Sequence, residues 1–308
     1  MTKVFIDGSA GTTGLRIRER LSARKDIALL TLPDEKRKDP AARAERFAEA
    51  DVAFLCLPDD AAREAVGLVG DAKTIVIDTS TAHRVSPDWT YGFPELAGQR
   101  EKIAKAKRIA NPGCHASGFV SLVAPLVSAG LLDRDASLSC FSLTGYSGGG
   151  KKMIAEYEDP ANAKRLQAPR IYGLSQTHKH LPEMQLICGL SHAPAFAPIV
   201  SSFYAGMAVT VELSADLLRG TVSDVIDLYR TVYHGPIVSW SGAADADGLL
   251  SAGVFAGRDD MEISVFGNDE RILLVSRFDN LGKGASGAAI QNMNIALGLP
   301  ETTGLVLG

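Results

Sequence analysis

The sequence predicts an α/β protein: a Rossmann-like, doubly wound parallel sheet followed by an α+β domain. Over the first 110 or so residues, short apolar strands alternate with helical segments, and strands such as residues 52–57 are apolar throughout. Alternating strands and helices form parallel sheets that helices cover on both faces, so their strands need no polar side. Beyond Cys114 the strands become longer and are joined by hairpins, which indicates an antiparallel or mixed sheet.

The elements of the first half follow in order from this alternation. Predicted strands are Val4–Ile6, Ile27–Leu32, Val52–Leu57 and Thr74–Ile77, and predicted helices are Leu15–Leu21, Ala41–Glu49 and Asp60–Val69.

The second half begins with a helical segment, Ser117–Val127. Further expected elements are a strand at Leu138–Thr144, a glycine turn at 148–150, a long alternating strand over 199–213, a helix at Asp216–Tyr233 with Ser214 as N-cap, a strand pair at Met261–Phe266 and Arg271–Phe278, and a helix at Gly284–Leu297.

Composition narrows the possible functions. The chain has 308 residues, of which 46% are hydrophobic and 22% charged, which is typical of about two folded domains and excludes a disordered chain. Its net charge of −4 argues against nucleic acid or an anionic membrane as a partner. No secretory signal and no apolar run of membrane-spanning length is recognised, so a cytoplasmic location is expected.

A glycine triad follows the first predicted strand. Gly8, Gly11 and Gly14 permit a tight turn whose N–H groups approach a pyrophosphate at a helix N-terminus. The alternative is a plain strand–helix turn. After the second strand, the cations Lys36 and Arg37 stand beside acidic residues and suit the 2′-phosphate of NADP better than the ribose hydroxyl of NAD, unless they are only a solvated loop.

Cys114 is the candidate nucleophile. It follows the turn Asn-Pro-Gly and opens a helical segment, whose N-terminus stabilises a thiolate. Cys56, Cys140 and Cys188 lie in apolar strands or segments and are expected to be inert core thiols. The competing interpretation of Cys114 is a small residue packed at a helix start.

A nucleophilic cysteine needs a base, and the pair His178 and His180 forms the one histidine cluster in the sequence. One of them could act as acid/base while the other binds substrate. His115 adjoins the cysteine, but neighbouring side chains often diverge, so it is judged a poor base. Metal binding by His-x-His is disfavoured because no ligand of clear spacing accompanies the pair, and no metal site is expected.

The motifs DGSAGTTG, ANPGCHASG, LTGYSGGGKK, THKHLPEM and DNLGKGASGAAIQNMN together resemble the N-acetyl-γ-glutamyl-phosphate reductases, in their shorter type. The resemblance extends from Lys3 to about Leu299. Aspartate-semialdehyde dehydrogenase, a relative, shares the cysteine segment, whereas HKHLPE points to the glutamyl enzyme.

The resemblance implies NADPH-dependent reduction of N-acetyl-L-glutamyl 5-phosphate to the 5-semialdehyde through a cysteine thioester, in arginine biosynthesis. It implies a two-domain fold with NADP on the first domain. The expected segments are an NADP-binding domain at 1–114, a catalytic and dimerisation domain at 115–279, and a C-terminal helix at 280–308 that returns to the first domain. It also implies a homo-oligomer, dimer or tetramer, with the second domain's sheet in the interface.

The resemblance also implies residue roles. Cys114 matches the nucleophile and His178 the acid/base. The expected substrate-binding residues are Ser147, Tyr172, His180, Glu183 and Arg84. The expected cofactor-binding residues are Gly8, Gly11, Thr12, Gly14, Lys36, Arg37, Ser80, Asn280 and Gly284.

Two other functions remain open from the sequence. Aspartate-semialdehyde dehydrogenase would use the same cysteine chemistry on a different acyl phosphate. A non-catalytic NADP-sensing regulatory protein would keep the glycine loop, but it would not need Cys114 and His178 together.

Overall fold

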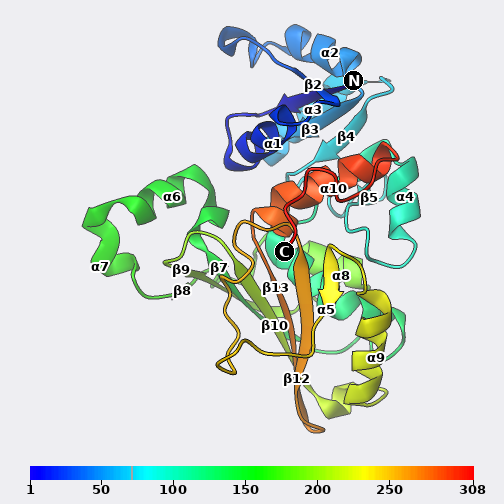
Figure 1. Ribbon diagram of the computed structural model, residues 1–308, viewed down its shortest axis with the longest axis vertical. Coiled ribbons are helices and arrows are strands. Elements are labelled where there is room, and N and C mark those ends of the chain that lie inside the picture. The colour runs from blue at the N-terminus through cyan, green and yellow to red at the C-terminus, as the bar shows by residue number, and fades with distance from the viewer. Residues whose placement is uncertain (71) are drawn as a thin grey trace. The chain divides into compact units, whose positions relative to one another are not determined.

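The computed structural model describes residues 1–70 and 72–308, and the chain divides into two compact units, whose helices and strands are labelled in Figure 1. The first unit comprises Met1–Pro94, Gly98–Pro112 and Ala285–Leu305. The second comprises Glu95–Ala97, Gly113–Gly284 and Val306–Gly308. The chain therefore leaves the first unit just before Cys114 and returns to it after Gly284, whereas the divisions expected from the sequence lie after residues 114 and 279.

The first unit contains a six-stranded, all-parallel sheet in the order β2-β1-β3-β4-β6-β5. The predicted doubly wound α/β fold is therefore confirmed. Its strands are β1 (Thr2–Asp7), β2 (Ile27–Leu30), β3 (Val52–Leu55), β4 (Ile75–Asp78), β5 (Thr90–Tyr91) and β6 (Arg108–Ala110); its helices are α1 (Thr12–Ser22), α2 (Pro40–Glu49), α3 (Asp59–Val69), α4 (Gln99–Lys105) and α10 (Gly287–Ala296).

Successive residues of β1 supply two hydrophobic cores, one on each face of this sheet. Val4 and Ile6 pack in one core with Ile17 of α1 and Met293 of α10. Phe5, between them, packs in the other with side chains of α2 and α3. Because side chains alternate along a strand and both faces are covered, an uninterrupted apolar run is what this sheet requires.

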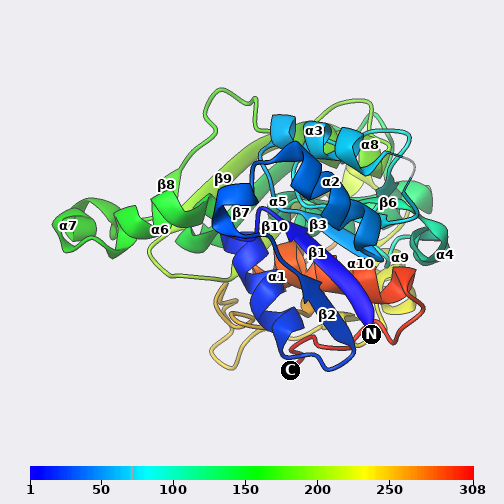
Figure 2. The same ribbon diagram turned by 90° about the horizontal axis from the view of Figure 1, so that it is seen from above.

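The second unit contains a seven-stranded mixed sheet in the order β11-β12-β13-β10-β7-β9-β8. Its strands are β7 (Ser139–Gly145), β8 (Arg170–Ile171), β9 (Ala195–Ser201), β10 (Met207–Ser214), β11 (Val238–Trp240), β12 (Met261–Gly267) and β13 (Arg271–Phe278); its helices are α5 (Cys114–Ser128), α6 (Gly150–Glu158), α7 (Ala163–Leu166), α8 (Leu181–Cys188) and α9 (Val222–Val232). Helices α6 and α7 project away from the strands (Figures 1 and 2).

Helix α5 is the centre of this unit. Almost every side chain after Cys114 is buried, and the helix packs on β10 and β13 and against α8 and α9. Gly118 permits this close packing, because a Cβ there would lie 2.4 Å from a methyl carbon of Val209. A helix that is apolar all round belongs in the interior, so Cys114 sits at the end of a rigid element.

Three details of the second half differ from the sequence predictions. The expected strand over 199–213 is two strands, β9 and β10, because residues 202–206 turn between them. Helix α9 starts later than expected: Thr221, not Ser214, is its N-cap and forms a capping box with Asp224. The glycine turn at 148–150 is a short 3₁₀ helix, Tyr146–Gly149, that leads into α6.

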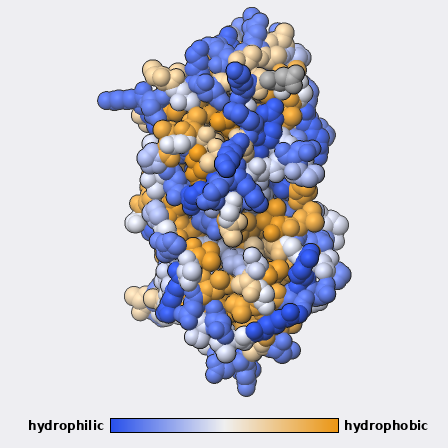
Figure 3. All heavy atoms as spheres, turned by 90° about the vertical axis from the view of Figure 1, so that its right-hand side faces the viewer, coloured by the Kyte–Doolittle hydropathy of each residue, from blue (hydrophilic) through white to orange (hydrophobic). Residues whose placement is uncertain are grey.

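The surface in Figure 3 carries hydrophobic patches between hydrophilic side chains. Folded proteins expose much apolar surface, so isolated exposed residues such as Leu186 and Leu249 need no special explanation. Within the part of the chain that the structure describes, no helix combines the length and the apolar character needed to cross a membrane.

Candidate active site

Cys114 is the first residue of α5, with Gly113 as the N-cap. Its side chain is half-buried. The first N–H groups of a helix have no intrahelical partner, and together with the helix dipole they favour negative charge. The start of α5 therefore suits a thiolate at Cys114, and the same N–H groups suit an oxyanion formed beside it.

The other three cysteines lie in different surroundings. Burial raises the pKa of the Cys56 thiol to about 12. Burial also raises the pKa of Cys140, and it raises that of Cys188 well above the ordinary value. These thiols are held in their protonated, unreactive form, which supports their interpretation as core residues.

Glu183, on α8, is tied to the residue before the cysteine. Its Oε1 accepts a hydrogen bond of 2.8 Å from the backbone N–H of Gly113, and its side chain is 1% exposed. The carboxylate therefore fixes the N-cap of α5 from a neighbouring helix. Glu183 is expected from the sequence to bind substrate. In the structure its carboxylate also holds the backbone of Gly113, the residue before Cys114.

Gly284 lies against Cys114 in the second unit. A Cβ at Gly284 would come within 2.9 Å of the Cβ of Cys114, so glycine permits this approach. Asn280, four residues earlier, donates to Ser147 Oγ at 2.9 Å and accepts from the N–H of Gly206 at 2.9 Å. Ser147 and Asn280 are thus brought together, although one was expected at the substrate and the other at the cofactor.

His178 and His180 lie on the turn that leads into α8, with ring centroids 4.8 Å apart and nearly perpendicular planes. His178 Nδ1 accepts a hydrogen bond of 3.2 Å from the backbone N–H of His180. A neutral imidazole that accepts at Nδ1 carries its proton on Nε2. The backbone therefore sets His178 as a donor at Nε2.

The loop before His178 is held by Gln176. Its amide donates to the carbonyl oxygen of Phe196 at 2.7 Å and accepts from the N–H of Phe196 at 2.8 Å. Gln176 has φ of 56°, which is strained for a residue other than glycine. The Phe196 ring lies 5.2 Å from His178 and 5.4 Å from His115, so this pairing sets the aromatic wall of the site.

His115 belongs to the same cluster. Its ring lies 5.7 Å from that of His178 and 5.6 Å from that of His180. Burial, with a further contribution from His178, lowers the pKa of His115 to about 3, so the ring is neutral. The sequence carried no signal for its hydrogen-bond partners, Ser142 on β7 and Tyr172 after β8.

The glycine loop of the first unit has distinct steric demands. Gly8 has φ of +86°, and a Cβ there would lie 2.3 Å from the carbonyl oxygen of Cys56; a Cβ at Gly14 would lie 2.6 Å from the carbonyl oxygen of Gly8. A Cβ at Gly11 would meet nothing closer than 3.7 Å. Gly8 and Gly14 thus permit tight packing of strand and helix, and Gly11 leaves the loop open to a pyrophosphate.

A cavity of about 390 Å³ lies beside this loop in the first unit. Its walls include Gly8, the cations Arg18, Arg37 and Lys38, and the carboxylates Asp7 and Asp34, of which Asp34 forms an ion pair of 2.7 Å with Arg37. Such a cradle with three cations suits a dinucleotide with a 2′-phosphate. Of the loop and cation residues expected at the cofactor, Gly8 and Arg37 border this cavity, whereas Gly11, Thr12, Gly14 and Lys36 do not. Arg18 of α1 was not expected there, because helical phase alone does not show which cavity an exposed side chain borders.

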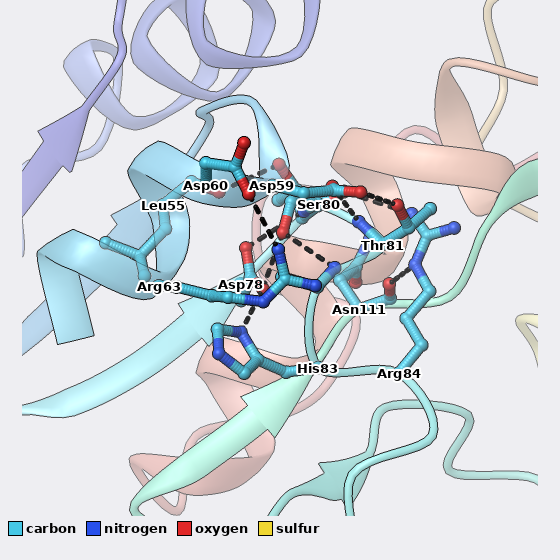
Figure 4. Close-up of polar contacts among 12 residues, drawn as sticks. Leu55, Asp59, Asp60, Arg63, Asp78, Ser80, Thr81, His83, Arg84 and Asn111 are labelled. Atoms are coloured by element: carbon cyan, nitrogen blue, oxygen red, sulfur yellow. Dashed lines mark hydrogen bonds and ion pairs between the residues drawn. The ribbon is translucent and has the colours of Figure 1, made fainter. Parts of the chain in front are cut away.

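Ser80 and Arg84 lie in a polar network after β4 in the first unit (Figure 4). Asp78 accepts from Ser80 Oγ at 2.7 Å, and His83 Nδ1 lies 2.7 Å from the same carboxylate. Arg84 donates from Nε to the carbonyl oxygen of Asn111 at 2.9 Å. Both candidate residues are therefore fixed at the carboxyl edge of the sheet, where ligands bind in this fold.

Among the residues that the structure describes, no group of three or more His, Cys, Asp or Glu side chains is arranged to hold a metal ion.

Comparison with known proteins adds to this geometry. Residues 34–106 match the model of the semialdehyde dehydrogenase NAD binding domain, and residues 114–280 match that of the semialdehyde dehydrogenase dimerisation domain. The chain is 48% identical to N-acetyl-gamma-glutamyl-phosphate reductase of Brucella anthropi over 306 residues, covering 96% of this chain and 98% of that protein. It is 45% identical to that of Burkholderia ambifaria, covering 96% of each.

Solved structures resemble the fold. Aspartate semialdehyde dehydrogenase II of Vibrio cholerae, solved in complex with ASA, superposes with a TM-score of 0.73 at 17% identity, covering 96% of this chain and 98% of that one. The enzyme of Candida albicans, solved with NADP, gives 0.66 at 18% identity, with the same coverage.

Proposed function

Because the chain belongs to the N-acetyl-gamma-glutamyl-phosphate reductase family, we propose that it reduces N-acetyl-L-glutamyl 5-phosphate to N-acetyl-L-glutamate 5-semialdehyde with NADPH, a step of arginine biosynthesis. The observation that carries the proposal is the placement of Cys114 at the start of α5, with Glu183 fixing its N-cap. His178 and His180, which precede α8, complete the proposed site.

The first unit suits NADP. Gly11 leaves the loop open, and Arg18, Arg37 and Lys38 supply positive charge at the adjoining cavity. In this proposal the loop N–H groups hold the pyrophosphate, the cations hold the 2′-phosphate, and Ser80 contributes from the network after β4. When bound, the reduced cofactor supplies a hydride to the acyl carbon.

The first chemical step is assigned to Cys114. Its thiolate, stabilised by the start of α5, attacks the acyl carbon of the substrate; the carbon–sulfur bond forms and the bond to the phosphate oxygen breaks. The departing phosphate needs a proton. We assign the acid/base position at this oxygen to His178, whose Nε2–H, set because Nδ1 accepts from the backbone, donates a hydrogen bond to the leaving oxygen. The proton itself comes from water, because a neutral imidazole that gave up its one N–H would become an anion.

The second step generates an oxyanion. Hydride addition to the thioester carbon places negative charge on its oxygen, which the N–H groups at the start of α5 stabilise. Collapse of that oxyanion expels the Cys114 thiolate and releases the aldehyde, so the nucleophile is restored without a further proton. Arg84, His180, Ser147 and Tyr172 are proposed to bind the substrate.

The test is Cys114→Ser with a matched variant, Cys188→Ala, assayed with N-acetylglutamate semialdehyde, phosphate and NADP. Cys114→Ser is expected to lower turnover by about 10³-fold or more, because a serine hydroxyl is a far weaker nucleophile. Cys188→Ala removes a buried thiol and should keep most activity. Near-normal turnover in Cys114→Ser would remove the nucleophile from the proposal.

The same assay on aspartate semialdehyde separates the nearest rival activity. Faster turnover of aspartate semialdehyde than of N-acetylglutamate semialdehyde would show that the proposed substrate is wrong. Stoichiometric alkylation of Cys114 without turnover on either substrate would favour an NADP-sensing protein.

We also propose a homo-oligomer built on the outer face of the second unit's sheet. The helices α5, α8 and α9 pack together, with α5 against β10 and β13. On the outward side, Phe141 pairs with Thr210 and Ala197 across neighbouring strands, and Leu143 pairs with Ala208 and Ile199. Phe141 is 42% exposed. A second copy of this chain would bury these side chains, as the name of the matching dimerisation domain suggests.

Sedimentation tests the interface. Phe141→Arg is expected to yield monomers, because it places a charge in an apolar contact. Leu15→Arg, on α1, changes a side chain that is also 42% exposed and should leave the oligomer intact. An unchanged Phe141→Arg oligomer would exclude this face. A cytoplasmic location is part of the proposal, because the nucleophile requires a thiol that stays reduced.

A further inference from the structure

A chain of hydrogen bonds runs from the sheet of the second unit to Tyr172. Ser142 Oγ, on β7, lies 2.6 Å from His115 Nδ1, and the Tyr172 hydroxyl lies 2.6 Å from His115 Nε2. Both distances are short for such bonds. The backbone of Tyr172 is held as well, since its N–H donates to the carbonyl oxygen of Pro198 at 3.0 Å. His115 thus bridges two side chains that are distant in sequence.

A neutral imidazole has one N–H donor and one acceptor nitrogen, so its two partners must play opposite roles. Two arrangements satisfy the chain. In one, Ser142 donates to His115 and His115 donates to Tyr172, which leaves the phenol O–H to point elsewhere. In the other, Tyr172 donates to His115 and His115 donates to Ser142.

The charge near Tyr172 selects between them. The Tyr172 hydroxyl binds the ring of His115, the residue next to Cys114. Burial, together with negative charge at Cys114, raises the pKa of Tyr172, so the phenol keeps its proton. Negative charge at Cys114 favours the first arrangement, in which Ser142 donates to His115 and His115 donates to Tyr172, because the Tyr172 O–H is then free to point toward that charge. Hydrogen bonds in such a chain also polarise one another.

We propose that His115 is a positioning residue: a neutral link that ties Ser142 to Tyr172 and sets the Tyr172 hydroxyl as a hydrogen-bond donor to negative charge at Cys114. Only the contribution of this link to turnover rests on the proposed function. The link itself is a property of the enzyme without substrate, because Ser142, His115 and Tyr172 are already joined there.

Other titratable groups face this cluster. His178 and His180 contact the His115 ring from the turn before α8, and Glu183 on α8 holds Gly113. A test must therefore leave these three side chains unchanged and alter the link alone.

The amides of asparagine and glutamine provide matched variants. An asparagine amide reaches about as far as Nδ1 of histidine, and a glutamine amide about as far as Nε2. His115→Asn should thus keep the contact with Ser142 and lose that with Tyr172, whereas His115→Gln should keep the contact with Tyr172. Tyr172→Phe removes the donor itself. Thermal unfolding of each variant reports whether the fold is retained.

The readout is the rate of Cys114 alkylation by iodoacetamide as a function of pH, without substrate or cofactor, in a Cys56→Ala background in which mass spectrometry locates the label. Losing a hydrogen bond to a charged group should move the midpoint of this profile upward by about one to two pH units in His115→Asn and in Tyr172→Phe. His115→Gln should stay near the parent. The double variant His115→Asn/Tyr172→Phe should shift no further than Tyr172→Phe alone.

An unshifted midpoint in folded His115→Asn, or additive shifts in the double variant, would overturn the proposal. A general loss of thermal stability with the midpoint unchanged would reduce His115 to a packing residue and overturn it equally. If the midpoints shift as expected while turnover is absent on both substrates, the link stands and the proposed function fails, so the two results are distinguishable.

Discussion

The carboxylate of Glu183 accepts a hydrogen bond from the backbone N–H of Gly113, although 70 residues separate them in the chain. Gly113 is the N-cap of α5, so this contact fixes the orientation of the first helical turn and of Cys114 within it. Because both partners are buried, the bond has no water to replace it.

Glu183→Ala should therefore destabilise the protein by about 1–3 kcal/mol, since it leaves a buried N–H without an acceptor. Glu183→Gln keeps an acceptor oxygen and should lose less. Denaturant unfolding measures the stability, and alkylation of Cys114 reports the geometry of the helix start. Equal losses in the two variants would mean that the charge, not the hydrogen bond, matters at this position.

Gly284→Ala should distort the site, because the new Cβ would lie 2.9 Å from the Cβ of Cys114 and 3.1 Å from the carbonyl oxygen of Asp279. Overpacking of this kind costs about 1–3 kcal/mol, and turnover should fall with it. The matched variant is Gly67→Ala on α3, where a Cβ meets nothing within 4 Å; it should stabilise the helix by about 0.5–1 kcal/mol. Normal turnover and stability in Gly284→Ala would contradict the close approach.

His115 should make stability depend on pH. Its pKa is about 3 in the folded protein against an ordinary value of 6.5. Between these two values the unfolded chain binds a proton that the folded one does not, so stability falls as the pH falls, by up to about 1.4 kcal/mol per pH unit. Above pH 6.5 this contribution is complete.

Unfolding measured from pH 7 to pH 4 should therefore show a shallower slope in His115→Gln than in the parent. His192→Gln removes an exposed histidine and serves as the control, with the parental slope expected. Identical slopes in His115→Gln and the parent would show that the ring is not kept neutral by burial.

Arg37→Ala should weaken NADPH binding by about 10-fold while changing NADH binding little, because a charge-assisted contact to the 2′-phosphate would be lost. Lys36→Ala is the matched control: both side chains are exposed, but Arg37 borders the cavity beside the glycine loop and Lys36 does not. Fluorescence titration with each nucleotide provides the affinities. A larger loss of NADPH affinity in Lys36→Ala than in Arg37→Ala would show that the 2′-phosphate does not bind at this cavity.

The sequence by itself determined the fold class and the position of the candidate nucleophile. Unbroken apolar strands alternating with helices predict the parallel sheet, because a strand that is buried on both faces needs apolar side chains at every position. The turn before Cys114 likewise marks the helix start at which the cysteine lies. The family resemblance, which rested on motifs spread along the chain, is confirmed by relatives at 45% and 48% identity.

Only the tertiary structure decided which side chains meet. Glu183 and Gly113, Gly284 and Cys114, and Ser142, His115 and Tyr172 are joined by contacts between elements far apart in the chain. Such pairings depend on strand order and helix packing, which no local pattern encodes. His115 shows the consequence most clearly: nothing in the sequence around it indicated that its ring would pack with those of His178 and Tyr172.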